Sequence, residues 1–400
     1  MTDQKKVQEQ DTQKISRRNV LKAAVAAGGA AALGFPMIAK AQGPITMRWQ
    51  STWPQKDIFH EYALDFAKKV NDMTGGDLKI EVLPAGAVVP AFQLLDAVSK
   101  GTLDGGHGVL VYHYGKQTAL ALFGSSPAYG MDANTLLAWF KYGGGRQLLD
   151  KLYKSVNANV VSFPYGPMPT QPLGWFKKPV TKADDMKGLK FRTVGISIDL
   201  FTGMGAAVNA LPGGEIVPAM DRGLLDAAEF NNASSDRILG FPDVSKVCML
   251  QSYHQNAEQF EILFNKNKFD ALPAKMRAMI EYAVEAASAD MSWKAIDRYS
   301  KDYVEMQTKD KVRFYKTPDS VLQKQLDIFD QVEAKKSAEN PMFKEIAESQ
   351  RQFAARAVKW FLDTQVSSRM AYNHYFVKKA TAKPTTPAAK PAAKPEPKKS

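Results

Sequence analysis

Two charged side chains, Arg192 and Glu229, stand at equivalent places in the middle of the chain. The run LKFRT holds the arginine and the run LLDAAEF holds the glutamate, and both runs are short and predict strands. Between them, Ile216 to Met220 has helical spacing. Because ligands of open α/β sheets bind beyond the carboxyl ends of the strands, we expect both side chains at a binding site.

The two side chains suit two different ligands. An arginine offers a planar fork of donors to a carboxylate, whereas a glutamate with nearby amide oxygens holds a hard cation. The pair therefore predicts one small anionic ligand and one metal ion. The alternative is that Arg192 is a surface strand residue and Glu229 a solvated turn acid, and their spacing alone does not separate the two interpretations.

Three motifs surround these residues: FRTVG at 191–195, PGGEIVPAMDRG at 212–223 and LLDAAEFNN at 224–232. In this order they resemble the solute-binding subunits of tripartite ATP-independent periplasmic (TRAP) transporters, the DctP-type family. The likeness runs from about Met47 to Asn267 and is greatest to the branch that binds 2-oxo acids and related monocarboxylates with a metal ion. It implies an α/β fold of two lobes, with a ligand cleft between them and long C-terminal helices.

The resemblance also implies roles for individual residues. Arg192 is expected to receive the carboxylate, and a sodium or calcium ion is expected on Gln171, Glu229 and the backbone of Phe230. Phe230 departs from the family, which usually has tryptophan there, so we expect a change in pocket size more than in cation binding. His254 is left out, because most isolated histidines are structural. The other expected ligand contacts are Tyr112, Asn231 and Gln255.

One phrase occurs twice, each time where a predicted helix meets a predicted strand. GTLDGGH at 101–107 and GLLDAAE at 223–229 lie 122 residues apart. The offset aligns His107 with Glu229 and predicts that residues 106–112 form the opposite wall of the cleft. Gly-x-Leu-Asp is also a common helix stop, with glycine after the last turn. A helix stop explains each helix-to-strand connection, but it does not explain why the same motif precedes both candidate walls of the cleft.

The first 41 residues have the composition of an export signal. SRRNVLK at 16–22 precedes an Ala/Gly-rich apolar stretch that ends at Ile38, and Ala39-Lys40-Ala41 fits an A-x-A cleavage site. The paired arginines indicate twin-arginine export, and the stretch is too short and too rich in glycine to favour a membrane anchor. We therefore predict a periplasmic protein whose mature chain begins at Gln42.

The formal net charge of +12 lies mostly at the two ends of the chain. Residues 1–41 hold seven Lys and Arg against three Asp and Glu, and residues 380–400 hold five Lys against one Glu, which leaves +4 for the body. An exported body with so small an excess is a poor nucleic-acid binder. Cys248 is the only cysteine, which excludes an intrachain disulfide, and its apolar neighbours predict a buried side chain.

Local patterns then predict the order of the domains. A strand at 44–49, a helix at 59–71 and a strand at 78–83 predict a βαβ unit with parallel strands. GPMPTQP at 166–172 is too rich in proline for regular structure and predicts the first crossing between lobes, and residues 259–265 predict the strand that crosses back. The predicted divisions are a signal peptide at 1–41, lobe I at 42–165, lobe II at 166–250, a return segment to lobe I at 251–300, C-terminal helices at 301–379 and a disordered Ala/Pro/Lys tail at 380–400.

The last predicted helix, Met342 to Val377, carries a face of phenylalanine and tryptophan that needs a partner. That partner is either the lobes of the same chain or a second copy, since this branch of the family can dimerise through its C-terminal helices. The helices that precede it are interrupted at Thr317-Pro318 and Asn340-Pro341.

Three classes of function compete. An exported metal-dependent enzyme acting on a small organic acid would need a nucleophile with a base or an activated metal water, and the chain has neither H-E-x-x-H nor G-x-S-x-G. A helical adaptor leaves the βαβ unit unexplained. We therefore predict a receptor without catalytic residues that delivers a monocarboxylate to TRAP membrane subunits. The sequence leaves open which carboxylate binds, and whether the ion is sodium or calcium.

Overall fold

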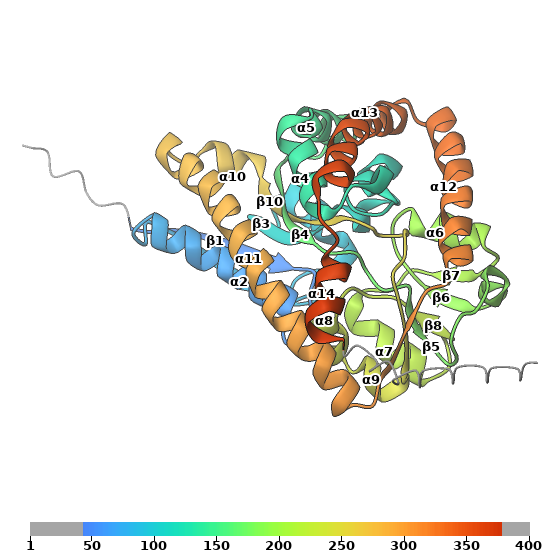
Figure 1. Ribbon diagram of the computed structural model, residues 1–400. Coiled ribbons are helices and arrows are strands. Elements are labelled where there is room, and N and C mark those ends of the chain that lie inside the picture. The colour runs from blue at the N-terminus through green and yellow to red at the C-terminus, as the bar shows by residue number, and fades with distance from the viewer. Residues whose placement is uncertain (1–42, 378–400) are drawn as a thin grey trace, which may run out of the picture. The chain divides into compact units, whose positions relative to one another are not determined.

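Two sheets organise the computed structural model, which describes residues 43–377 (Figure 1). Residues 44–377 belong to one compact unit. The predicted signal peptide and the predicted tail lie outside the described residues. Within residues 43–377, no helix combines the length and the unbroken apolar run that a membrane crossing needs.

The first sheet starts with the predicted βαβ unit. Strands β1 and β2 pair in parallel, with Ile45 opposite Leu78, and helix α2 between them is held by a cap from Asp57 to the backbone N–H of Phe59. Strand β10, which returns from the second lobe, lies antiparallel between β3 and β4. In the order β2-β1-β3-β10-β4, the strands are Leu78–Leu83, Ile45–Ser51, Gly105–Val109, Glu258–Asn265 and Val160–Met168.

The second sheet contains the two strands on which the predicted site depends. Strands β6 and β8 are parallel neighbours, and Arg192 lies opposite Ala228. The sequence did not predict β7 or β11, which pair with β6 and β9 at the two edges of this sheet. In the order β11-β9-β5-β8-β6-β7, the strands are Arg313–Lys316, Val247–Leu250, Gly174–Phe176, Ala227–Ala228, Lys190–Arg192 and Ala207–Asn209.

Helix α11 (Ala274–Thr308) connects the two halves of the unit. It packs against α2 (Ile58–Met73) and β4 of the first lobe and against α8 (Ala233–Leu239) of the second (Figure 1). Helix α12 (Asp319–Glu339) then packs against the second lobe, and α13 (Pro341–Thr364) packs against the first. The other α-helices are α3 (Leu94–Ser99), α4 (Ala133–Tyr142), α5 (Gly145–Ser155), α6 (Ser197–Gly203), α7 (Gly213–Asp221), α9 (Phe241–Val244), α10 (Lys266–Asp270) and α14 (Ser368–Phe376).

Three local predictions were wrong, each because of a long-range contact or a local cap. Strand β4 continues through Pro167 to Met168, because Met168 pairs with Glu258 of β10. Residues 313–316 form β11 within the predicted helical region, because they pair with β9. The last predicted helix is two helices, since α13 ends at Thr364 and Ser367 caps α14 through the N–H of Met370.

Buried side chains tie the two lobes together. The hydroxyl of Ser235 on α8 donates to Asp57 Oδ1 at 2.6 Å, and Ser125 and Ser197 form a hydroxyl pair at 2.9 Å. The carboxyl of Asp57 is 1% exposed, and burial raises its pKa from 3.8 to about 6 despite these hydrogen bonds. The contact between the lobes therefore contains a carboxyl group that takes up a proton at a higher pH than an exposed aspartate does.

This carboxyl group makes the stability of the unit depend on pH. Because the pKa of Asp57 is higher in the folded state, the free energy of unfolding should fall as pH rises from about 4 to 7. Two pKa units correspond to a loss of up to about 3 kcal/mol. Asp57→Asn keeps an acceptor for Ser235 and abolishes this titration, so its stability relative to wild type should rise over that interval. Denaturant unfolding at a series of pH values measures the difference, and parallel curves for the two proteins would contradict the assignment.

Candidate functional site

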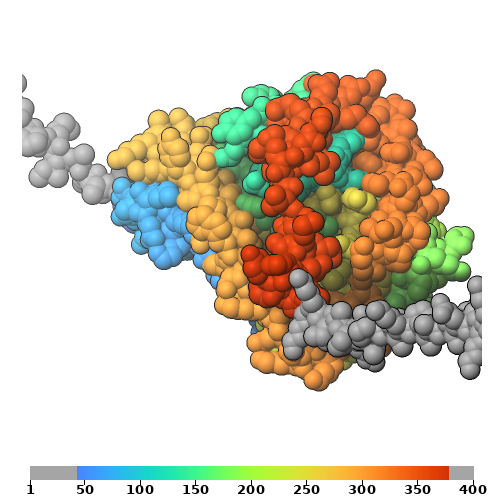
Figure 2. Space-filling model, viewed as in Figure 1, coloured from blue at the N-terminus to red at the C-terminus, as the bar shows by residue number. Residues whose placement is uncertain are grey.

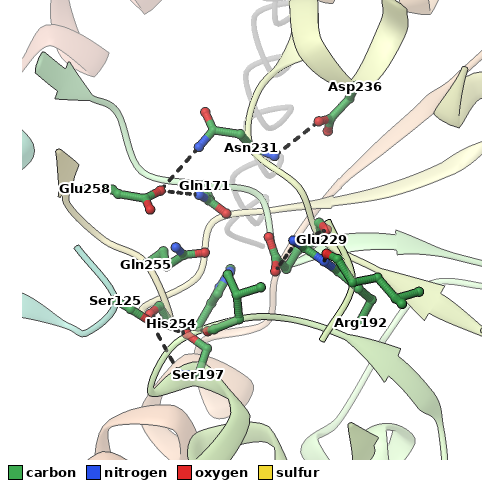
Figure 3. A network of polar contacts seen from close by, with 12 residues as sticks. Ser125, Gln171, Arg192, Ser197, Glu229, Asn231, Asp236, His254, Gln255 and Glu258 are labelled. Atoms are coloured by element: carbon green, nitrogen blue, oxygen red, sulfur yellow. Dashed lines mark hydrogen bonds and ion pairs between the residues drawn. The ribbon is translucent and has the colours of Figure 1, made fainter. Parts of the chain in front are cut away.

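Arg192 and Glu229 form a buried ion pair where β6 and β8 end. Arg192 Nη1 donates to Glu229 Oε1 at 2.8 Å and to the backbone carbonyl of Glu229 at 3.1 Å, and Nε donates to the carbonyl of Leu211 at 2.8 Å (Figure 3). The sequence predicted that the two residues would be neighbours but not that they would pair with each other. The arginine thus joins two strand ends and the segment that precedes α7.

Burial controls the electrostatics of this pair. Arg192 is 1% exposed and Glu229 is fully buried, and desolvation raises the pKa of Glu229 although the charge of Arg192 opposes the shift. Each side chain also keeps one buried atom without a hydrogen-bond partner, Arg192 Nη2 and Glu229 Oε2. Unpaired buried polar atoms are costly, so these two are candidates to contact a ligand.

The two chain segments that cross between the sheets supply amide side chains. Gln171 follows β4 and Gln255 precedes β10, and the N–H of Gln171 donates to the carbonyl of Gln255 at 3.2 Å. Both side chains are almost fully buried, and the oxygen Oε1 of each lacks a partner. The crossings therefore bring two unpaired amide oxygens to the middle of the unit.

These side chains meet at one small cavity. Its volume is about 20 Å³, which is the space that a single water molecule needs, so a three-carbon acid cannot enter until the lobes separate. Glu229 is not among the residues that line the cavity, and its Oε1 accepts from Arg192 Nη1. The lining residues that the sequence predicted are Tyr112, Gln171, Arg192, Phe230, Asn231 and Gln255, and the others are Trp53, Phe59, Val109, Met168, Val194 and Glu258.

The donors around the cavity fit a hard cation. Gln171 and Gln255 line the cavity with unpaired Oε1 atoms, and oxygen is the ligand type that sodium and calcium prefer. In residues 43–377 no three His, Cys, Asp or Glu side chains gather as a metal-binding group, so such an ion would depend on amide and backbone oxygens as well as carboxylates. The chemistry of the donors thus agrees with the predicted ion, whereas the role of each predicted ligand stays a prediction.

Glu258 is the charged cavity residue that the sequence analysis missed. It begins β10, is 3% exposed, and accepts hydrogen bonds at Oε2 from Gln171 Nε2 at 2.8 Å and Asn231 Nδ2 at 3.5 Å. Burial raises its pKa well above the usual value, and the charge of Glu229 adds to the shift. An acid at the start of the apolar run QFEILF was the signal available in the sequence.

Neither of the two histidines near the site lines the cavity. His107, which the repeated phrase aligned with Glu229, accepts at Nδ1 from Trp53 Nε1 at 2.7 Å and contacts the hydroxyl of Tyr165. Burial lowers its pKa to about 3. His254 lies beside Ser252, and burial likewise lowers its pKa to about 3. Neither lines the cavity, so the predicted wall at 106–112 contributes Val109 and Tyr112 instead.

Phe230 closes one side of the cavity against a glycine. Its ring lies 5.8 Å from the guanidinium carbon of Arg192 and 5.9 Å from the ring of Phe59. A Cβ atom added to Gly213 would lie only 2.6 Å from the Phe230 ring. The packing of Phe230 therefore requires glycine at the first position of α7.

Comparisons with known proteins agree on one family. The model of bacterial extracellular solute-binding proteins, family 7, matches residues 50–340, and the model of twin-arginine translocation signals matches residues 14–34. The monocarboxylate 2-oxoacid-binding periplasmic protein of Nostoc sp. is 36% identical over 247 residues, which are 61% of this chain and 67% of that protein.

Two solved structures extend the likeness. A TRAP transporter solute-binding protein from Bordetella bronchiseptica RB50, a dimer with calcium and picolinate in one of its sites, is 28% identical, with a TM-score of 0.77 over 83% of this chain and 97% of that one. A TRAP solute-binding protein from Pseudoalteromonas atlantica T6c, with bound sodium and pyruvate, is 27% identical, with a TM-score of 0.76 over 83% of this chain and 99% of that one.

The contact between Gly213 and Phe230 predicts a loss of stability for Gly213→Ala. The new methyl group must displace the ring, and overpacking of this kind costs about 1–3 kcal/mol. The better helix propensity of alanine offsets up to about 1 kcal/mol of that cost. Gly115→Ala is the control, because a Cβ atom there meets nothing within 4 Å. Denaturant unfolding should show a lower free energy of unfolding for Gly213→Ala alone, and equal values for both variants would refute the contact.

Proposed function

Because the chain belongs to bacterial extracellular solute-binding protein family 7, whose members are the solute receptors of TRAP transporters, we propose that it binds a small monocarboxylate with an oxo or hydroxy oxygen on its second carbon, together with a metal cation. The twin-arginine signal at residues 14–34 directs export to the periplasm. The family is one of receptors, and on this proposal the chain carries no catalytic residues.

One observation supports this ligand class most directly. Arg192 Nη2 and the oxygens Gln171 Oε1 and Gln255 Oε1 are buried without partners, and all three side chains line the same cavity. A free guanidinium N–H group recognises a carboxylate, and amide oxygens recognise a cation. A ligand that brings a carboxylate and a cation together would satisfy both kinds of atom, because the carboxylate would accept from the guanidinium and the cation would bind the amide oxygens.

The proposed roles follow from these atoms. Arg192 receives the ligand carboxylate through Nη2, while Glu229 balances the charge of the arginine. Gln171, Glu229 and the backbone of Phe230 would hold the cation, and Asn231, Gln255 and Tyr112 would contact the ligand. The cation would supply a positive charge for the oxo or hydroxy oxygen beside the carboxylate.

Binding requires the lobes to open and close. The cavity is too small for the ligand in the structure described, and its walls come from both sheets and from the crossings at Gln171 and Gln255. Hinge motion at the crossings would admit the ligand, and closure would present the ligand-bound receptor to the membrane subunits of the transporter.

A neighbouring groove bears on the size of the ligand. It has a volume of about 600 Å³ and shares Tyr112 and Val194 with the small cavity. Its apolar lining includes Phe92, Val111 and Ile198. A monocarboxylate whose apolar tail passes Tyr112 could use this groove, so the proposed ligand class includes acids longer than three carbons.

The C-terminal helices support a homodimer as part of the proposal. The first half of α13 is covered by its own chain, since Phe343, Ile346 and Ala354 are buried. From Trp360 onward the surface changes, and Figure 2 shows α14 on the outside of the molecule. The large apolar side chains exposed there are Trp360, Leu362, Val366, Met370, Tyr372, Tyr375 and Phe376. Large apolar side chains gathered in one exposed segment are typical of an interface, and a second copy is the proposed partner.

The roles of the ion pair are tested by two substitutions. Arg192→Lys keeps the charge but loses the fork, so affinity for a 2-oxo acid should fall roughly ten- to a hundredfold while the cation stays bound. Glu229→Gln removes a carboxylate charge, so cation content should fall first and ligand affinity with it. Calorimetry with pyruvate and longer 2-oxo acids, beside atomic spectroscopy for the ion, measures both effects.

The control for the first substitution is Arg222→Lys, at an exposed arginine after α7. This variant should bind like wild type. Normal binding by Arg192→Lys would place the carboxylate elsewhere, and tight binding of a sugar without any response to 2-oxo acids would overturn the ligand class.

The homodimer is tested by two truncations. Removal of residues 366–400 deletes α14 and should give a folded monomer, because the buried residues of α13 stay in place. Removal of residues 378–400 alone should leave a dimer. Light scattering measures the mass of both proteins, and an unchanged mass without α14 would assign the apolar surface to another partner.

A further inference from the structure

Three polar side chains from different parts of the fold meet beside the groove that adjoins the small cavity. The hydroxyl of Tyr114, in the first lobe, donates to Oδ2 of Asp199, which lies on α6 of the second lobe. Asp199 Oδ1 pairs with Nζ of Lys336 on α12 at 3.0 Å, and this Nζ lies 5.4 Å from the centre of the Tyr114 ring. Tyr114, Asp199 and Lys336 thus form one cluster, the rim cluster.

The rim cluster spans a groove whose walls come from both lobes. Residues 111–116 line the groove from the first lobe, and Val194 and Ile198 line it from the second. Hinge motion that separates the lobes moves these two walls apart. The hydrogen bond from Tyr114 to Asp199 therefore forms only when the lobes are closed.

Lys336 prepares Asp199 for this contact from the side of the second lobe. Helix α12 packs against α6 (Figure 1), and a Cβ atom added to Gly203 of α6 would lie only 2.7 Å from Ile328 of α12. Because the two helices are in such close contact, they should move together and keep Lys336 beside Asp199. Lys336 supplies positive charge to the Asp199 carboxylate, and hydrogen bonds to a carboxylate are stronger than those between neutral groups.

We propose that Tyr114 and Asp199 form a latch that holds the receptor closed, with Lys336 as the residue that positions Asp199. The inference rests on the proposed function, because closure is the step that retains the ligand. None of the three side chains lines the small cavity, so the latch acts through the closed form and not through contact with the carboxylate or the cation. A smaller closed population weakens apparent binding in proportion.

The first test removes only the hydroxyl of the latch, in Tyr114→Phe. Pyruvate is the probe, because a three-carbon acid has no tail that could reach the groove. Its affinity should fall about five- to tenfold, the usual effect of losing one hydrogen bond to a charged group, and its dissociation rate should rise. Calorimetry and stopped-flow displacement measure the two quantities. Unchanged binding by Tyr114→Phe would overturn the latch.

A double-mutant cycle shows whether the residues act through one contact. Asp199→Ala should weaken pyruvate binding at least as much as Tyr114→Phe, and the two changes together should weaken it no more than Asp199→Ala alone. Lys336→Met should weaken binding by a smaller factor, and it should have no further effect in Asp199→Ala. Additive losses would mean that the residues act separately, and they would contradict the proposal. If Tyr114→Phe does not fold, Asp199→Ala replaces it in each measurement.

Tyr153→Phe is the matched control. It also removes a hydroxyl that donates to a carboxylate, that of Glu261, but Tyr153 on α5 and Glu261 on β10 both belong to the first lobe and its sheet. This variant should have a lower free energy of unfolding and the pyruvate affinity of wild type. An equal loss of affinity in Tyr153→Phe and Tyr114→Phe would assign the effect to general stability and overturn the latch.

A distance measurement without any added acid separates the latch from the function on which it rests. Gln93 and Asn209 are exposed next to Phe92 and Ala210, which line the groove from opposite lobes, so spin labels on cysteines at 93 and 209 report its width. The natural Cys248 is 1% exposed and should stay unlabelled.

Pulsed electron paramagnetic resonance should show a closed fraction that falls at least fivefold from wild type to Tyr114→Phe. The same closed fraction in both proteins would overturn the latch. Wild type that binds neither pyruvate nor a longer 2-oxo acid would overturn the ligand class instead, and the two distance distributions would still decide the latch.

Discussion

A buried arginine must have a partner, and the second lobe is arranged around this requirement. Arg192 meets it with Glu229 and with the carbonyl of Leu211. These contacts connect the ends of β6 and β8 with the segment before α7, so the strand order of the second sheet places the guanidinium at the cavity. Breaking such a pair leaves an uncompensated charge in the interior, which is strongly destabilising. On the proposed function, recognition of a carboxylate and stability of the second lobe would depend on the same side chain.

The cavity exists only where the two lobes meet. Arg192 and Phe230 come from the second sheet, Val109 and Tyr112 from the first lobe, and the amides from the crossings between them. A hinge at the crossings would thus change the distance between the arginine and the amide oxygens. This arrangement explains how a receptor couples closure to occupancy, because the closed form has its full set of contacts only with the ligand and its cation present. The hydroxyl pair of Ser125 and Ser197 and the contact between Asp57 and Ser235 add polar contacts that hold the closed form.

Much of the architecture could be predicted from local patterns. The βαβ unit, the parallel placement of Arg192 beside Glu229, the returning strand β10 and the long helices follow from periodicity, glycine turns and the order of motifs. Strands β7 and β11 could not be predicted in this way, since each has three or four residues and is stabilised by its neighbour in the sheet. Proline at 167 favoured irregular structure, yet pairing with β10 extends β4 beyond it. In each case a contact distant in sequence outweighed the local propensity.

For the site, the sequence by itself determined which residue types stand at the strand ends and the crossings, because strand and helix periods are local properties. The position of Arg192 at a strand end and the resemblance to the family together predicted six of the residues that line the cavity: Tyr112, Gln171, Arg192, Phe230, Asn231 and Gln255. Only the tertiary structure decided that Glu229 turns onto Arg192, that His107 is used in packing, and that Glu258 enters the cavity beside Gln171. The physical reason is that a buried polar side chain takes its role from the groups around it, and those neighbours are distant in the sequence.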